Sequence, residues 1–184
     1  MLTAERLRTT SRHDYLLYLW YVEDVLRAFG CDMERIEQGY LPRILGQIDE
    51  ETQRTAVRRW YAELCEMMHS EGCVQSGHLQ IVRNVEQELD ELHRRLLQSP
   101  ERFPDYNGLF QKALPALREL QQRNGATEEA DTRTMLGALY GLTLLTLQGK
   151  EISAPTKDAC ERFGSLLRNL SVYYLKDKEE PLGQ

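Results

Sequence analysis

The stretch from Asp14 to Gly30 reads DYLLYLWYVEDVLRAFG, and it is apolar around most of its circumference when it is set on a helix. A helix of this kind is covered by several neighbours, not by one. The polar residues that remain form one narrow wedge, made of His13, Glu23, Asp24 and Arg27. We expect this wedge to reach solvent, with Glu23 paired to Arg27 four residues later. The alternative is that Glu23 and Asp24 begin a buried active site.

Glycines, prolines and capping residues divide the chain into helical segments. No segment alternates between apolar and polar residues, so no strand is predicted. We expect helices over roughly 11–30, 32–46, 49–72, 78–98, 105–123 and 127–149, and a seventh from 153 onward. Pro42 should bend or shorten the second helix, and Pro115 should kink the fifth. The sequence therefore predicts an all-α, single-domain bundle of about six to seven helices over residues 1–176, with a mobile polar tail over 177–184.

The segment TMLGALYGLTLLTLQ, from Thr134 to Gln148, contains no charged residue. We expect it to be the second central apolar helix, beside the first and enclosed by the others. Gly137 and Gly141 lie four residues apart on one face, and they predict a notch that another helix can approach closely.

The overall charge limits the classes of partner. The 184 residues carry a formal net charge of −6, which disfavours general nucleic-acid binding because phosphate contacts need a basic surface. Nucleic-acid binding would require these arginines to converge on one face: Arg54, Arg58, Arg59, Arg94 and Arg95. We expect no secretory signal and no membrane span, since the longest uncharged run is shorter than the roughly 18 residues that a span needs. Four cysteines without a CxxC pair favour free thiols in a cytoplasmic protein.

Two sets of residues have spacings that suit a metal. Cys65 and His69 share a helical face, and thiolate with imidazole suits zinc. Glu66-x-x-His69 and Asp90-x-x-His93 match the spacing of di-iron helical bundles, in which Glu23 would be a further ligand. Glu66 points away from the apolar stripe of its helix, however, and so does Asp90. No cofactor is predicted, and a bound transition metal stays open as an alternative.

Other chemical patterns are weaker. His78 and His93 lie near the apolar line of their helix, where a hydrogen-bonded core histidine is the usual occupant. A small-ligand site built from His78, His93, Glu23 and Tyr140 is the alternative. Arg8 and His13 have the spacing seen in some helical ribonucleases, but no basic groove accompanies them. No phosphate-binding loop, dinucleotide fingerprint or nucleophile elbow is found.

Several motifs together resemble a family of small, uncharacterised helical proteins of about 180 residues from Bacteroidetes, catalogued as a domain of unknown function. The matching motifs are YLLYLWYVEDVLRAFG, Gly77-His78-Leu79, LHRRLLQSP, Lys112-Ala113-Leu114-Pro115, Leu139-Tyr140-Gly141 and Lys150-Glu151-Ile152-Ser153. The resemblance implies a cytoplasmic, all-helical, single-domain protein, and it brings no activity or catalytic residue.

These observations favour a non-enzymatic helical protein that binds a protein partner or itself. The two most apolar helices carry more apolar surface than one neighbour covers, and a symmetric dimer is the simplest assembly that would cover it. The alternative is a metal- or small-ligand-binding bundle, in which His78 and His93 act with nearby carboxylates.

Overall fold

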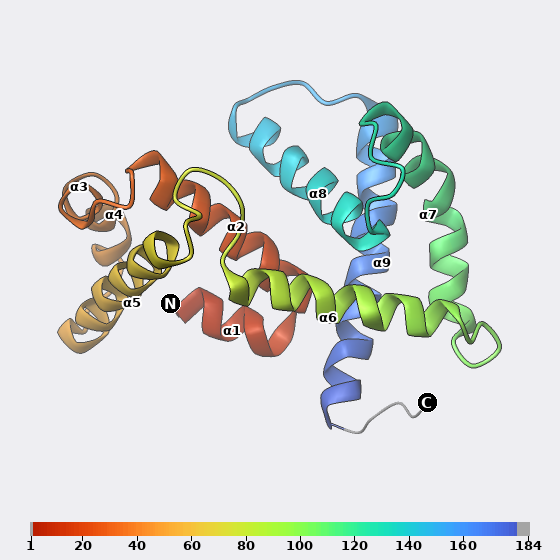
Figure 1. The fold of residues 1–184 in the computed structure, drawn as a ribbon, viewed down its shortest axis with the longest axis horizontal. Coiled ribbons are helices and arrows are strands. Elements are labelled where there is room, and N and C mark those ends of the chain that lie inside the picture. Colours follow the sequence, from red (N-terminus) through yellow and green to blue (C-terminus); the bar gives the residue numbers. More distant parts are fainter. Residues whose placement is uncertain (1, 180–184) are drawn as a thin grey trace. The chain divides into compact units, whose positions relative to one another are not determined.

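The computed structural model describes residues 2–179, and within them the chain forms nine helices and no strand. The helices are α1 (Leu2–Thr10), α2 (Arg12–Ala28), α3 (Met33–Gly39), α4 (Leu41–Leu45), α5 (Glu51–Ser70), α6 (Gln80–Leu97), α7 (Pro104–Arg123), α8 (Asp131–Leu147) and α9 (Ala154–Glu179) (Figure 1). The predicted all-α class is confirmed, and the helices are more numerous than the six to seven expected.

The chain divides into two compact units, and the single domain expected from the sequence stays a prediction. Within the described residues, the first unit comprises 2–8 and 18–84, and the second comprises 9–17 and 85–179. The long helices α2 and α6 contribute residues to both units. No helix within the described residues is long and apolar enough to cross a membrane.

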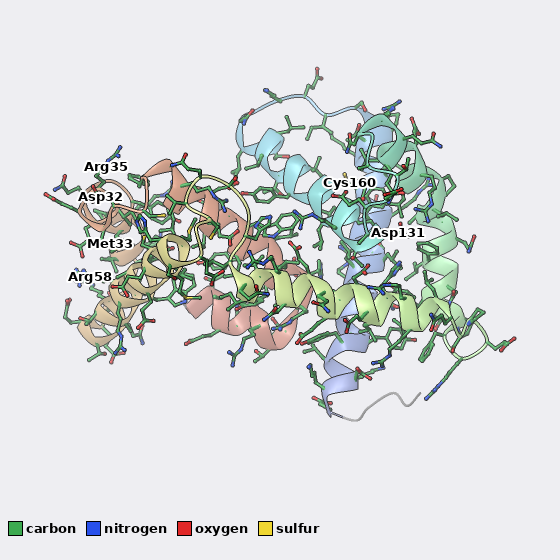
Figure 2. The ribbon with its side chains drawn as sticks, viewed as in Figure 1. Asp32, Met33, Arg35, Arg58, Asp131 and Cys160 are labelled. Atoms are coloured by element: carbon green, nitrogen blue, oxygen red, sulfur yellow. The ribbon has the colours of Figure 1, made fainter. Side chains whose placement is uncertain are left out.

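In the first unit, α3, α4 and α5 pack against one another. The side chain of Asp32 caps α3 by accepting hydrogen bonds from the backbone N–H groups of Glu34 and Arg35, at 2.9 and 3.3 Å (Figure 2). Pro42 lies in the first turn of the short α4, and the single helix expected over 32–46 is two helices that meet at Tyr40. The core of this unit is made of apolar side chains from α2 to α5, among them Val22, Leu26, Ile36, Leu41, Val57, Tyr61, Leu64 and Met68.

In the second unit, α9 packs against both α7 and α8. Its core includes Leu89, Leu96, Tyr106, Leu117, Met135, Leu136, Phe163 and Leu170, which are at most 1% exposed. Ser153 caps α9 as expected, because its Oγ accepts from the backbone N–H of Thr156 at 3.3 Å. The helix expected from residue 127, with Thr127 as its N-cap, begins instead at Asp131 after a turn, so this boundary is wrong.

Three expectations need further correction. The segment before Ser11 was not predicted to be helical, but it forms α1. The helix α9 extends to Glu179, three residues into the segment predicted to be a mobile polar tail; residues 180–184 lie outside the described part, so the mobile tail stays a prediction. The apolar segment 134–148 is not an enclosed central helix: the buried residues of α8 are Thr132, Thr134, Met135 and Leu136, all in its first half.

Candidate functional site

Glu23, on α2, is buried against the start of α6. Its side chain is 2% exposed, and its Oε2 accepts a hydrogen bond from Nδ1 of His78 at 2.6 Å. Its Oε1 accepts from the backbone N–H of Leu79 at 2.8 Å. The ring of Trp20 stacks on the imidazole of His78, with the centroids 5.1 Å apart and the planes 17° apart. The expectation that Glu23 lies in a solvent-facing wedge is therefore wrong, and its expected pairing with Arg27 is a longer contact of 3.9 Å.

The carboxylate of Glu23 binds a backbone N–H group at the start of α6. The first backbone N–H groups of a helix have no partner inside that helix. Here carboxylates from other elements supply acceptors: Glu23 binds the N–H of Leu79, and Glu71 binds the N–H of Gln80 at 2.6 Å. Negative charge is also favourable at the positive end of the helix dipole. Because both oxygens of Glu23 are occupied, we interpret its pairing with His78 as a clamp that holds the start of α6.

Arg27, on α2, binds the loop between α5 and α6, which runs from residue 71 to residue 79. Its Nε donates to the carbonyl of Cys73 at 3.4 Å, and its Nη2 donates to the carbonyl of Gly77. Its Nη1 pairs with Asp24 at 2.9 Å. Asp24 is exposed, so the solvent-facing part of the predicted wedge is confirmed for this residue. Two helical turns of α2 thus hold the segment that leads into α6.

His93 lies in the core of the second unit, as expected for a histidine on an apolar face. It is 2% exposed, and its Nδ1 lies 2.6 Å from the hydroxyl of Tyr106. Burial raises the pKa of Tyr106 well above its usual value, so the phenol stays neutral and shares a hydrogen bond with Nδ1. Nε2 of His93 lies 3.8 Å from Oδ2 of Asp131, and this nitrogen has no hydrogen-bond partner within residues 2–179. Asp131 lies at the start of α8 (Figure 2). His93 and His78 therefore belong to different units, and each has its own polar contacts.

The residues considered for a metal have other surroundings. Cys65 is buried, and burial raises the pKa of its thiol to about 12, whereas His69 on the same helix is exposed. Asp90, in the second unit, accepts a hydrogen bond from the hydroxyl of Thr132 at 3.0 Å. Across residues 2–179 no group of three or more His, Cys, Asp or Glu side chains lies close enough together to hold a metal ion.

The second half of α8 forms an uncharged surface. Leu145 is 37% exposed and Leu147 is 70% exposed, and no charged residue follows Arg133 in this helix. At 100° per residue, one side of the helix carries the residues that we call the outer face: Tyr140, Thr143, Leu144 and Leu147. The opposite side carries Ala138, Gly141, Leu142 and Leu145.

The notch predicted at Gly137 and Gly141 is not filled by another helix. A Cβ atom built on either glycine would meet no atom within 4 Å. Tyr140, considered for a ligand site with His78 and His93, is half-buried on the outer face of α8. Of the four residues considered for that site, Glu23 and His78 are in contact within the first unit.

A family model matches residues 1–181. The chain belongs to the domain of unknown function DUF4924. This confirms the resemblance to a domain of unknown function. No curated protein matches the DUF4924 chain, and no solved structure does.

Two partners of buried histidines in this DUF4924 chain were not predicted. Nδ1 of His13 lies 2.8 Å from the hydroxyl of Ser171, and Tyr106 binds His93. His93 lies near an apolar stripe, which indicates that a partner is needed but not which residue supplies it. His13 was expected in the solvent-facing wedge, and this is wrong because it is 3% exposed. Ser171 lies on the last helix of the chain and Tyr106 on the helix that follows the one with His93, and tertiary packing brings each partner close to its histidine.

Proposed function

We propose that this protein is a non-enzymatic cytoplasmic helical protein that associates with a second copy of itself through the outer face of α8. The exposure of Leu147 supports this proposal, because the residue is 70% exposed. It lies at the end of α8, in the half of the helix that carries no charged residue. Contiguous exposed apolar surface is typical of interaction sites, and half-buried Leu144, one turn from Leu147 on the same face, would extend this surface. A two-fold axis would place the same face of both copies in contact and cover it.

The contacts of Glu23 and His78 argue against ligand binding at that pair, and this favours association as the function. Both oxygens of Glu23 already accept hydrogen bonds from the start of α6. A ligand there would have to displace a contact that holds the helix. The four cysteines are free and buried, which supports a reducing compartment such as the cytoplasm.

The test is sedimentation velocity on the full chain at concentrations from about 1 to 100 µM, which covers the weaker range of specific complexes. We expect a concentration-dependent dimer. Leu147→Glu should weaken that dimer at least ten-fold, because two like charges would face each other across the axis.

The matched control is Val172→Glu. Val172 is also an apolar residue of the second unit, 49% exposed, but it lies on α9. This variant should sediment as the unaltered chain does. A chain that remains monomeric over the whole range would refute the proposal, and equal disruption by both variants would refute the assignment to α8.

A further inference from the structure

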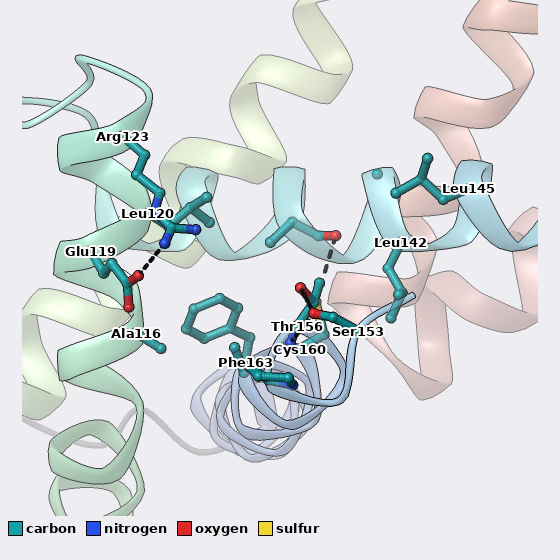
Figure 3. Close-up of a pocket in the computed structure, with 14 residues that line it drawn as sticks. Ala116, Glu119, Leu120, Arg123, Leu142, Leu145, Ser153, Thr156, Cys160 and Phe163 are labelled. Carbon is teal, nitrogen blue, oxygen red and sulfur yellow. Dashed lines mark hydrogen bonds and ion pairs between the residues drawn. The ribbon is translucent and has the colours of Figure 1, made fainter. Parts of the chain in front are cut away.

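A cavity of about 490 Å³ lies among α7, α8 and α9 in the second unit (Figure 3). Each helix contributes a large apolar side chain to its lining: Leu120 from α7, Leu142 from α8 and Phe163 from α9. The volume falls within the roughly 300–1,000 Å³ typical of sites for small molecules. Nothing in the sequence pattern indicated a cavity here, because its lining comes from three separate helices.

The cavity exists because small residues face one another where large ones would close the space. Ala116 on α7, Gly141 on α8 and Ala159 on α9 all belong to its lining. A Cβ atom on Gly141 would meet nothing within 4 Å, so the missing side chain contributes directly to the space. Glycine inside a helix costs about 1 kcal/mol relative to alanine. We attribute the glycine at position 141 to the cavity, which a larger side chain would fill.

The charged groups at the cavity neutralise each other. Glu119 and Arg123, one turn apart on α7, form an ion pair of 2.7 Å. This contact is drawn in Figure 3, where both side chains lie at the α7 side of the space. Neither residue therefore presents an unmatched charge to a ligand.

The neutral polar groups at the cavity are matched as well. The hydroxyls of Ser153 and Thr156 lie 2.9 Å apart at the start of α9. The thiol of Cys160 lies 3.9 Å from the carbonyl oxygen of Ala138, and burial raises its pKa, so it stays a neutral thiol. A charged ligand group buried against the apolar lining would lose its water without gaining an oppositely charged partner, which is unfavourable.

We infer that the cavity among α7, α8 and α9 binds an uncharged small molecule with an apolar body. The apolar lining supplies the binding free energy, and the matched polar groups select against a charged head. This function is separate from the association proposed above, because Ala138, Gly141 and Leu142 lie on the side of α8 opposite to the outer face.

The first test compares three probes on the full chain by titration calorimetry: 1-octanol, 1-hexanol and octanoate. We expect 1-octanol to bind, and 1-hexanol to bind about fifteen-fold more weakly, since burying two methylenes contributes about 1.6 kcal/mol. Octanoate should bind at least ten-fold more weakly than 1-octanol. Absence of 1-octanol binding up to its solubility limit would overturn the inference, and equal binding of octanoate would overturn the uncharged class.

The second test locates the site with a matched pair of variants. Gly141→Leu places a side chain into the cavity, and Gly137→Leu adds the same side chain one turn away, outside the lining. Both variants should fold, because both positions are open in space and leucine is the better helix former. Gly141→Leu should weaken 1-octanol binding at least ten-fold, and Gly137→Leu should leave it unchanged. Unaltered binding by Gly141→Leu, or equal loss in both variants, would overturn the assignment.

Discussion

Replacing Glu23 with alanine should lower the free energy of unfolding by more than is expected for a residue in a solvent-facing wedge. The substitution leaves Nδ1 of His78 and the N–H of Leu79 without the carboxylate that now binds them at 2.6 and 2.8 Å. Leaving each of these two donors without an acceptor costs about 1–3 kcal/mol, so we expect a loss of about 2–6 kcal/mol. Because a protein of this length loses roughly 2–4 °C of Tm for each kcal/mol, we expect Tm to fall by about 10 °C. Urea unfolding followed by circular dichroism measures the free energy directly.

Two further variants show whether the buried contacts cause this loss. Glu23→Gln keeps an acceptor for Leu79 and removes the charge-assisted bond to His78, so it should cost about 1–2 kcal/mol. Asp24→Ala removes the exposed neighbour, whose pair with Arg27 at 2.9 Å is a surface contact, and it should cost at most about 1 kcal/mol. If Glu23→Ala costs no more than Asp24→Ala, the clamp at the start of α6 does not contribute to stability and our interpretation fails.

Two other predictions concern His13 and Gly137. Burial first of all, and the nearby Arg168, lower the pKa of His13 below 6.5, although Asp14 acts in the opposite direction. The unfolded chain therefore binds this proton more readily, so stability should fall as the pH drops below about 6.5, and His13→Gln should reduce that dependence in urea titrations at pH 7.5 and 5.5. Gly137→Ala should raise the free energy of unfolding by about 1 kcal/mol, because a Cβ atom there meets nothing within 4 Å. A loss of stability instead would indicate that a close approach at Gly137 is needed.

Much of the helical layout could be predicted because its signals are local. Asp32 caps α3, Ser153 caps α9, and Gly30 follows the end of α2 with a positive φ of 69°. Such residues act on backbone groups one to three positions away, so the sequence alone identifies them. Pro42 also acted as expected, although its effect was a division into α3 and α4 and not a bend.

The errors at Glu23 and in α8 share one physical cause: periodicity describes a helix alone, whereas burial depends on what packs against it. Glu23 lies in the polar wedge of α2, but a loop 55 residues later brings His78 against it, and two hydrogen bonds compensate for its burial. The second half of α8 is more apolar than α2, and yet Leu147 stays 70% exposed, since within the described residues no neighbour covers it. Apolar patterning therefore indicates how much surface must be covered, and it does not indicate whether the same chain, a ligand or a second copy covers it. On one side of α8, Gly141 favours a bound ligand, and on the opposite side Leu147 favours a second copy of the chain. The cavity and the outer face therefore need separate experiments.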